Sequence, residues 1–477
     1  MTDQTMTPRD GRPVASGAIA PEPGGPMHTI EDVVGRGMCV GCGACAARTG
    51  GAVRVQIGTR RSYEADLTGA TPAAVREASR VCPFSDESRN EDAIANDRFA
   101  GLRHDPRVGY FSTLKAARLN DESRLMGSSS GGLTSWVAEQ LLRRDRVDAV
   151  IHVTPTHTES GPMFSYTTSD TPEAFAAERK SMYTATTMAD ILQAVRGNGK
   201  RYAVIGVPCF LRAARLLSEQ DAVFGGQLKY FLGLVCGHLK SQAFAESLAW
   251  QAGVEPDDLE AVDFRIKVPG RLSSHYDVQA TAKDGTTKTA HTHDLVGGNW
   301  GHAMFQANAC NFCDDIFAET ADVAFGDGWL PEYKEEWRGT NVVVSRHPDI
   351  DEIFADEAAV WSVPLTVEQV AATQGGNFRH RRIGLSVRLH DDVAAGLSVP
   401  RKRVAASLEG IDPQRVELIR LRRRMSEESH EAFAEARRRG SLAYFLRRMR
   451  PFLRRYDNVS RGNRLTRLRQ RVRRMLR

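Results

Sequence analysis

The stretch Tyr202-Ala-Val-Ile-Gly-Val-Pro-Cys-Phe-Leu-Arg-Ala-Ala-Arg-Leu-Leu217 decides the fold. Its first part, residues 202–207, is a short apolar run, which is typical of a buried strand. Its second part, residues 210–217, carries apolar residues at helical spacing. A buried strand that leads directly into an amphipathic helix indicates a layered α/β architecture.

The same alternation of apolar runs and amphipathic stretches extends from about Thr113 toward the C-terminus. Further buried strands are predicted at residues 149–153, 230–235, 323–325 and 342–344, and further helices at 133–142, 188–195 and 243–250. Residues 262–290 alternate like an antiparallel hairpin, with Asp284-Gly285 as the turn signal. The sequence therefore predicts an α/β fold that contains α+β elements.

Composition and patterning divide the chain into four segments. Residues 1–28 are rich in Pro, Gly, Thr and Ala without periodicity, so we expect a disordered leader there. Residues 29–100 contain a small cysteine module, and residues 101–400 form the α/β core. Residues 401–477 are expected to form a basic helical tail.

The expected compartment gives weight to the eight cysteines. The N-terminus lacks the basic-then-apolar pattern of a secretory signal, and no run approaches the roughly 18 apolar residues of a spanning helix. We therefore expect a cytoplasmic protein, in which cysteines bind metals or act in catalysis more often than they form disulfides. The net charge of +5 is mild and its basic residues concentrate after Arg415, so specific nucleic-acid binding is not expected.

Four of the cysteines are spaced as in half of a bacterial ferredoxin. Cys39-Val-Gly-Cys42-Gly-Ala-Cys45 supplies three thiols in one tight loop, and Cys82-Pro83 supplies a remote fourth. A 4Fe-4S cluster needs four thiolates around one compact core, which this spacing provides. Gly41 and Gly43 suit a loop that wraps a cluster with positive φ angles. A structural zinc site is the alternative, although zinc modules usually present paired CxxC knuckles.

The other four cysteines are scattered in the sequence, but each can be placed on the predicted elements. Cys209 ends the strand stretch Tyr202-Ala-Val-Ile-Gly-Val-Pro-Cys209 and precedes the helix that starts near Phe210. Cys236 follows the strand at 230–235, and Cys310-Asn-Phe-Cys313 adds a CxxC knuckle. Because carboxyl ends of neighbouring parallel strands meet at one edge of a sheet, these thiols can converge on a second 4Fe-4S cluster. Buried unligated thiols, zinc binding and thiol exchange are the alternatives for this set.

Taken together, these motifs resemble the family of coenzyme F420 hydrogenase/dehydrogenase beta subunits. The resemblance rests on the ferredoxin-like cysteines and on an ordered series of motifs that ends at about Pro331. The further motifs are Ser128-Ser-Ser-Gly-Gly132, Gly206-Val-Pro-Cys209, Gly233-Leu-Val-Cys236, Phe264-Arg-Ile-Lys267, Ala309-Cys-Asn-Phe-Cys313 and Ala321-Asp-Val-Ala-Phe-Gly-Asp327. One departure is Gly237-His238 after Cys236, where many relatives are expected to have His followed by Gly.

The resemblance implies an oxidoreductase that depends on FAD and on one or two 4Fe-4S clusters. A flavin accepts one or two electrons, so it is the natural converter between clusters and hydride chemistry. Coenzyme F420 is the candidate hydride cofactor, with another deazaflavin or a reducible organic substrate as alternatives. An electron donor or acceptor protein is the expected partner.

The turn before the helix at 133–142 is the expected dinucleotide site, because a Gly/Ser turn at a helix N-terminus offers N–H groups and dipole to a pyrophosphate. A plain helix cap is the alternative. The candidate contacts for the flavin or its phosphates are Ser128, Ser129, Ser130, Gly131, Gly132, Lys180, Tyr183, Arg265, Lys267 and Asp327. No catalytic residue is assigned, because a lone histidine such as His238, His291, His293 or His302 is more often a surface or core residue than a proton donor.

The basic tail has arginines interleaved with apolar residues at roughly helical spacing, in Arg447-Arg-Met-Arg450, Arg454-Arg455 and Arg471-Val-Arg-Arg474. Such a helix can lie on the inner face of an anionic membrane, dock on an acidic partner or be only solvated. Two alternative functions stay open from the sequence. One is a zinc-binding scaffold or regulatory protein. The other is a cluster-dependent redox modifier in cell-surface polysaccharide biosynthesis, because relatives of the family are associated with such genes.

Overall fold

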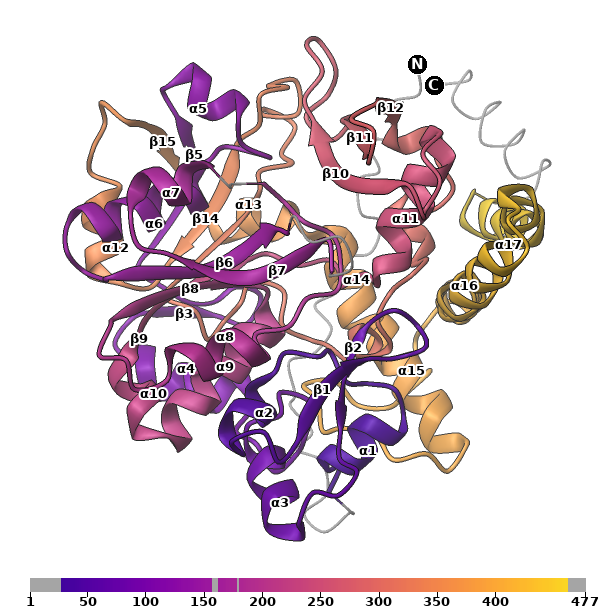
Figure 1. Cartoon of the computed structure of the whole chain (residues 1–477), viewed down its shortest axis with the longest axis horizontal. Helices are drawn as coiled ribbons and strands as arrows, with labels where there is room; N and C mark the ends of the chain where they lie inside the picture. Colours follow the sequence, from indigo (N-terminus) through magenta and orange to yellow (C-terminus); the bar gives the residue numbers. More distant parts are fainter. Residues whose placement is uncertain (1–26, 157–161, 178–179, 462–477) are drawn as a thin grey trace.

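The computed structural model describes residues 27–156, 162–177 and 180–461 (Figure 1). Residues 1–26 of the expected leader and residues 462–477 of the expected tail lie outside the described residues. His28, which the sequence assigns to the leader, is buried, and its backbone N–H donates to the Asp86 carboxylate at 3.0 Å. His28 is therefore packed against the cysteine module.

An eight-stranded sheet lies at the centre of the fold, with the strand order β15-β5-β14-β13-β9-β8-β6-β7 (Figure 1). Its strands are β5 (Thr113–Leu119), β6 (Ala149–Pro155), β7 (Phe164–Ser169), β8 (Tyr202–Gly206), β9 (Leu228–Leu234), β13 (Val323–Asp327), β14 (Asn341–Ser345) and β15 (Val360–Pro364). The neighbours β6, β8, β9 and β13 run parallel, and the other pairings are antiparallel. The carboxyl ends of these four strands therefore meet at one edge, where α/β folds commonly build their sites.

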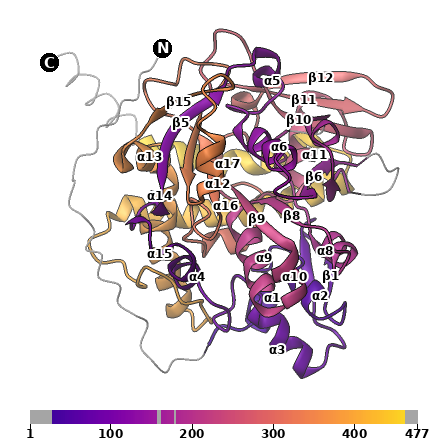
Figure 2. The same ribbon diagram turned by 90° about the vertical axis from the view of Figure 1, so that its left-hand side faces the viewer.

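Helices cover both faces of this sheet, as Figures 1 and 2 show. One face carries α6 (Leu133–Arg143), α7 (Pro172–Ala177) and α12 (Pro348–Ile353), and the other carries α8 (Ala189–Val195), α9 (Pro208–Gln220) and α10 (Ala222–Gln227). Successive side chains of a strand point to opposite faces of the sheet. Val150 therefore packs in the hydrophobic core under α6, α7 and α12, while Ile151 packs in the core under α8, α9 and α10. The short α5 (Glu122–Met126) precedes α6.

The cysteine module lies beside the second of these faces (Figure 1). It consists of α1 (Ile30–Gly35), α2 (Ala44–Arg48), β1 (Arg54–Ile57), β2 (Tyr63–Asp66), α3 (Pro72–Arg80) and α4 (Glu91–Phe99), followed by the hairpin of β3 (Arg103–Asp105) and β4 (Gly109–Phe111). The Met188 N–H donates to the Cys42 carbonyl oxygen at 3.2 Å. Residues of α2 and α9 belong to one hydrophobic core, so the module and the sheet are packed as one body.

The rest of the described chain after β9 is a smaller three-stranded sheet with helices around it. It contains α11 (Gln242–Ala252), the antiparallel strands β10 (Leu259–Ile266), β11 (Asp277–Ala282) and β12 (Thr287–His291), and the 3-10 turns η1 (Thr292–Asp294), η2 (Trp300–His302) and η3 (Asn308–Asn311). The helices α13 (Val367–Ala372), α14 (Gly375–Arg381), α15 (Ile383–Ala394), α16 (Pro413–Arg438) and α17 (Leu442–Arg461) follow.

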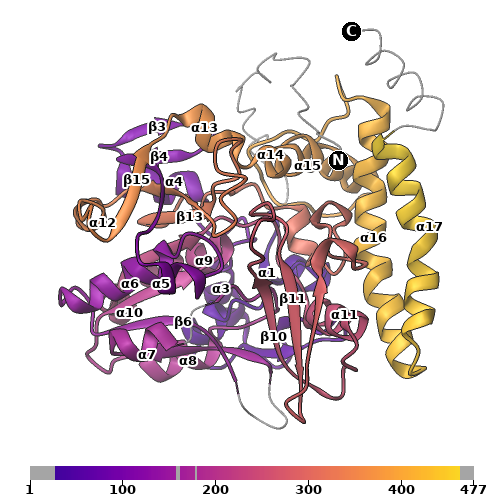
Figure 3. The same ribbon diagram turned by 90° about the horizontal axis from the view of Figure 1, so that it is seen from above.

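The last two helices lie side by side along one edge of the molecule (Figure 3). Phe433 of α16 and Phe445 of α17 pack on Phe305, with ring centroids 5.7 and 5.8 Å away. The helical tail is therefore packed onto the body of the protein through apolar contacts. In the described part of the chain, no helix combines the length and apolar character needed to cross a membrane.

Each strand and helix predicted from the sequence is present, with ends that differ by a few residues. The region at 262–290 forms three antiparallel strands, and Gly285 in the predicted turn has a φ of 83°. The placement of Cys209 at a strand end was wrong. Strand β8 ends at Gly206, and Cys209 lies in the first turn of α9 because Pro208 suits the first helical position.

Candidate functional site

The cysteines of the ferredoxin-like motif, called the first thiol set, line one small cavity in the N-terminal module. This set is Cys39, Cys42, Cys45 and Cys82. Gly41 and Gly43 have φ angles of 68° and 88°, so the loop adopts the left-handed conformations predicted for it. A Cβ at Gly41 would lie 2.7 Å from the Tyr63 carbonyl oxygen, so the loop leaves no room for a side chain there.

Cys42 and Cys45 of the first thiol set are buried, Cys39 and Cys82 are half-buried, and backbone amides point at one of the sulfurs. The N–H groups of Gly41 and Ala65 donate to Cys39 Sγ at 3.4 and 3.2 Å. Burial raises the pKa of Cys82 to about 12, so this thiol on its own keeps its proton at neutral pH. Four sulfurs around one cavity, with amide donors, have the chemistry that an iron-sulfur cluster requires of its ligands.

The structure brings the other cysteines, called the second thiol set, together at the carboxyl edge of the parallel strands. This set is Cys209 in the first turn of α9, Cys236 after β9, Cys310 in η3 and Cys313 after η3. Burial, and then the charges of Cys313, Cys236 and Cys310, raise the pKa of Cys209 well above its ordinary value. The four thiols therefore lie within electrostatic range of one another, as the sequence predicted.

Arg381, at the end of α14, contacts the second thiol set directly. Its Nη1 donates to Cys313 Sγ at 2.9 Å, and its Nη2 donates to the carbonyl oxygens of Cys236 and Gly237 at 2.7 and 2.8 Å. Its side chain is buried. Burial raises the pKa of Cys236 to about 11, although the Arg381 charge opposes this rise. No sequence motif pointed to Arg381, because it lies far along the chain from every cysteine.

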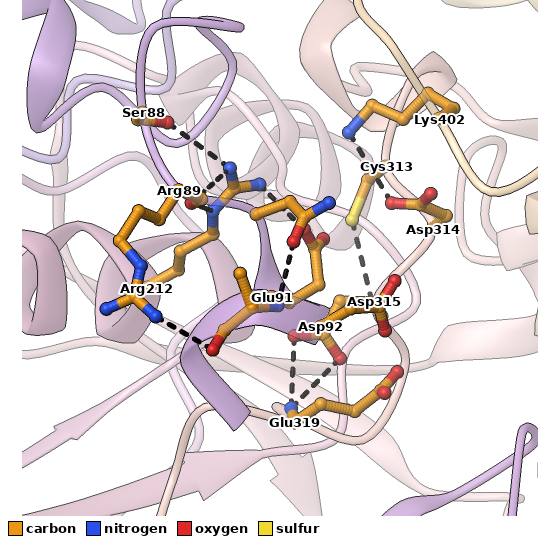
Figure 4. Close-up of polar contacts among 12 residues, drawn as sticks. Ser88, Arg89, Glu91, Asp92, Arg212, Cys313, Asp314, Asp315, Glu319 and Lys402 are labelled. Carbon is orange, nitrogen blue, oxygen red and sulfur yellow. Dashed lines mark hydrogen bonds and ion pairs between the residues drawn. The ribbon is translucent and has the colours of Figure 1, made fainter. Parts of the chain in front are cut away.

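Charged residues border the second thiol set on its other side (Figure 4). Lys402 forms an ion pair with Asp314, next to Cys313, at 3.4 Å. Arg212 of α9 forms a buried ion pair with Glu91 of α4 at 2.8 Å. The first pair ties the segment after α15 to the loop that carries Cys313, and the second ties the N-terminal module to α9, which carries Cys209.

The two thiol sets are neighbours. A small cavity is lined by Pro83 and Phe84 from beside the first set and by Cys209 and Cys313 from the second. The charge of Cys42 also contributes to the raised pKa of Cys209. Within the described ranges, no group of three or more His, Cys, Asp or Glu side chains is arranged to hold a single metal ion.

A larger cavity, of about 280 Å³, lies at the carboxyl ends of β8, β9 and β13. Residues 205–207, 234–240 and 325–327, which end these strands or follow them, form part of its wall. Its volume is close to the lower end of the range for small-molecule sites, about 300 Å³. Cys236 of the second thiol set lines this cavity, so the cavity and the second set adjoin.

The predicted Gly/Ser turn forms another wall of the cavity, together with the first turn of α6. Gly132 is the N-cap of α6 with a φ of 82°, and it lines the cavity with the first turn of the helix. The Leu133 N–H in that turn donates to Asn341 Oδ1 at 3.2 Å. Ser129 Oγ accepts the Ser181 N–H at 2.8 Å, which joins the turn to the segment that carries Lys180 and Tyr183. Gly131 packs against Asn341 and does not line the cavity.

The other predicted flavin contacts fall into two groups. Lys180, Tyr183, Arg265 and Asp327 line the cavity, and Lys267 does not. Arg265 is buried and forms an ion pair with Asp327 at 2.8 Å, while its Nε has no partner among the described residues. Lys267 donates to the Ser130 carbonyl oxygen at 3.0 Å, and burial lowers its pKa to about 7. Lys267 therefore supports the turn from behind.

Three further residues lie at the Cys236 end of the cavity, and of these only His238 was considered from the sequence. His238 is buried, and its Nε2 has no partner within the described chain. Lys240 donates to the Met304 carbonyl oxygen at 2.6 Å and lies 4.9 Å from the ring centre of Trp300. Burial lowers the pKa of Lys240 to about 7. The unpartnered nitrogens of His238 and Arg265 fit a ligand with hydrogen-bonding edges, such as a flavin ring.

The remaining histidines considered in the sequence lie elsewhere. His291 and His293 stack beside His275 at the end of β12, with ring centroids 5.8 and 4.6 Å from the His275 ring. His302 packs on Tyr456, with ring centroids 4.8 Å apart. None of these three residues lines the cavity.

Two family models match the chain. The model for the N-terminal part of the coenzyme F420 hydrogenase/dehydrogenase beta subunit matches residues 114–193, and the model for its C-terminal part matches residues 199–367. Together these ranges cover more than half of the chain. The chain belongs to this family of beta subunits. The resemblance predicted from the motifs is thus confirmed, and the family is one of oxidoreductase subunits, which disfavours the zinc-scaffold alternative.

Relatives among the coenzyme F420 hydrogenase/dehydrogenase beta subunits are distant in sequence. The chain is 23% identical over 315 residues to one subunit of the F(420)H(2) dehydrogenase of Methanosarcina mazei, and the match covers 63% of this chain and 80% of that protein. It is 25% identical over 230 residues to the beta subunit of the coenzyme F420 hydrogenase of Methanococcus voltae, and the match covers 46% of this chain and 76% of that protein. Both relatives are named as subunits.

A comparison with solved structures gives a weaker likeness. A chain of the F420-reducing NiFe hydrogenase complex from Methanosarcina barkeri, studied by xenon derivatisation, superposes with a TM-score of 0.47 at 16% identity. The superposition covers 63% of this chain and 99% of that chain.

Proposed function

We propose that this protein is an iron-sulfur flavoprotein that moves electrons between two 4Fe-4S clusters and a hydride cofactor through a bound FAD. The observation that carries the proposal is that Cys236 of the second thiol set lies in the wall of the large cavity. The first thiol set adjoins the second through the small cavity at Phe84 and Cys209. The two thiol sets and the large cavity therefore lie in series, an arrangement suited to stepwise electron transfer.

The proposed division of labour follows the segments of the chain. Residues 29–100 form a ferredoxin-like module for the first cluster, and residues 101–400 hold the FAD and the second cluster. A flavin bound in the large cavity supplies the conversion between one-electron and two-electron chemistry. Because the enclosed volume is small, a bound dinucleotide extends beyond it.

The residues around the large cavity have distinct proposed roles. The Ser128–Gly132 turn and the N-terminus of α6 bind the phosphates through backbone N–H groups. Arg265, held by Asp327, orients the flavin from the cavity wall. Tyr183 and Trp300, whose ring centroids are 5.0 Å apart, exclude water from the ring.

Coenzyme F420 is the proposed hydride cofactor, and another protein subunit is the proposed electron partner. Both proposals draw on the family and on the names of the two relatives, which are subunits of coenzyme F420 enzymes. The chain is proposed to act in the reducing cytoplasm, where its thiols stay available for metal.

Anaerobic purification tests the proposed cofactors. We expect a brown protein with about eight iron and eight sulfide per chain and one flavin. Addition of reduced coenzyme F420 should bleach the flavin absorbance, and reduced ferredoxin should do so through the clusters. A colourless protein that contains zinc and no flavin would refute the proposal.

Two matched variants separate the clusters. Cys82→Ser removes a ligand of the first thiol set, and Cys310→Ser removes a ligand of the second. Each variant should lose about four iron atoms and keep the cluster at the other thiol set. The paramagnetic resonance signal that remains should therefore differ between the two variants. Loss of all iron in both variants, with retained folding, would contradict two separate sites.

The outer face of α17 is proposed to contact an anionic membrane surface. Arg447, Arg450 and Arg454 are exposed, while Phe445 and Met449 are buried against the body of the protein. Replacement of the three arginines by glutamine therefore tests the charge without uncovering the core. We expect this variant to partition less onto phosphatidylserine vesicles. Unchanged partitioning would remove the membrane proposal and leave a solvated helix or an acidic protein partner.

A further inference from the structure

Arg381 is a buried cation that makes no hydrogen bond to a carboxylate among the described residues, although the Asp315 carboxylate lies within electrostatic range. Its side chain is 1% exposed. Among the described residues, its partners are Cys313 Sγ and the backbone carbonyl oxygens of Asp315, Cys236 and Gly237. An ion buried in this way is costly unless an opposite charge lies close to it.

The second thiol set is the nearest source of that opposite charge. Nη1 of Arg381 lies 2.9 Å from Cys313 Sγ, which is the distance of a charge-assisted contact. Deprotonated thiols that bind a metal centre carry negative charge, whereas protonated thiols do not. The guanidinium is thus placed as if the sulfurs beside it were thiolates.

The same side chain also joins the two loops that carry three of the thiols. One arm reaches the carbonyl oxygens of Cys236 and Gly237, and the other reaches Cys313 and the Asp315 carbonyl oxygen. A planar guanidinium with several donors suits such a bridge better than a lysine ammonium does. Arg381 lies beyond residue 367, where the family match ends, so the C-terminal region of this chain completes the site.

We propose that Arg381 is a positioning residue that fixes both ligand loops and supplies the countercharge that sets the reduction potential of the second cluster. This inference rests on the proposed function, because it concerns a cluster held by the second thiol set. Reduction adds an electron to the cluster and makes it more negative. A fixed cation in contact with a ligand sulfur favours that state and so raises the potential.

The test uses the anaerobically purified full chain and a potentiometric titration followed by paramagnetic resonance. Arg381→Gln removes the charge and is expected to move one of the two cluster waves to lower potential while the other wave stays in place. Arg381→Lys keeps the charge but not the bridge, and should move the same wave by less. Arg379→Gln is the matched control, because Arg379 is exposed on the same helix two residues away, and it should move neither wave.

Iron and sulfide content separate the possible failures. A wild-type protein without iron refutes the proposed function itself, whereas full iron content with unmoved waves in both Arg381 variants overturns only this inference. Loss of half the iron in both Arg381 variants supports the positioning role, because neither variant keeps the bridge. Loss of half the iron in Arg381→Gln alone supports the countercharge and overturns the positioning role. If Arg381→Gln does not fold, Arg381→Lys carries the test, and an unchanged potential in it overturns the proposal.

Discussion

Replacing Gly41 by alanine is expected to remove the first metal site alone. A residue with a side chain at the φ of 68° found there costs about 1–2 kcal/mol. The new Cβ would also lie 2.7 and 2.8 Å from the Tyr63 carbonyl oxygen and carbon, which are backbone atoms that cannot rotate away. Overpacking of this kind adds about 1–3 kcal/mol. We therefore expect the backbone of the loop to shift, so that its cysteines no longer converge on the cavity.

Gly50 in the same module provides the control for this substitution. Its φ is 60°, close to that of Gly41, but a Cβ there would have no atom within 4 Å. Gly50→Ala therefore carries the conformational cost without the clash. The assay is iron content per chain after anaerobic purification, where Gly41→Ala should lose about four of about eight iron atoms and Gly50→Ala should lose none. Equal iron content in the two variants would refute the reasoning from the close approach of Tyr63.

Three further substitutions test other parts of the molecule. Asp327→Asn removes the charge that holds Arg265 at the cavity wall, so we expect at least about tenfold weaker flavin retention, measured by fluorescence of released flavin. Burial lowers the pKa of His152 to about 4 from 6.5, so this residue makes the unfolding free energy fall as pH drops from about 6.5 to about 4. The loss is at most about 3 kcal/mol, and His152→Gln should flatten this part of the curve in urea titrations at several pH values. Phe433→Ala should lower the unfolding free energy by about 3–5 kcal/mol, because Phe433 is buried among Phe305, Phe445 and Trp250; an unshifted urea midpoint would show that α16 does not pack as described.

The sequence predicted the parts of the fold whose signals are local. Strands β8 and β9 are continuous apolar runs because both faces of the sheet are covered, and such runs stand out. Strands β5, β7 and β15 were missed because polar residues interrupt their apolar residues, and β7 and β15 also lie at the two ends of the sheet. Their pairing depends on neighbours that are distant in the chain, and periodicity does not show such neighbours.

The residues of the candidate site also separate into those with a local sequence signal and those without one. Cysteine spacing grouped the first thiol set, whose members line one cavity. The strand-end argument grouped Cys209 with Cys236, although Cys209 lies in the first turn of α9 and not at the end of β8. Arg381 and Lys240 could not be predicted, because an arginine in a helix and a lysine in a loop carry no pattern that marks them as buried. Lys267 does not line the large cavity, since its ammonium group donates to the Ser130 carbonyl oxygen behind the turn.

The packing of the cysteine module against the sheet has a consequence for how electrons travel. Small carrier modules in some redox systems swing between a donor and an acceptor, and their speed depends on that movement. Here the Met188 N–H donates a hydrogen bond to the Cys42 carbonyl oxygen, and α2 and α9 belong to one hydrophobic core. Movement of the cysteine module would therefore require this core to separate. In the proposed relay, the spacing between the two thiol sets is therefore fixed when the chain folds, and electron transfer between them needs no movement of the cysteine module.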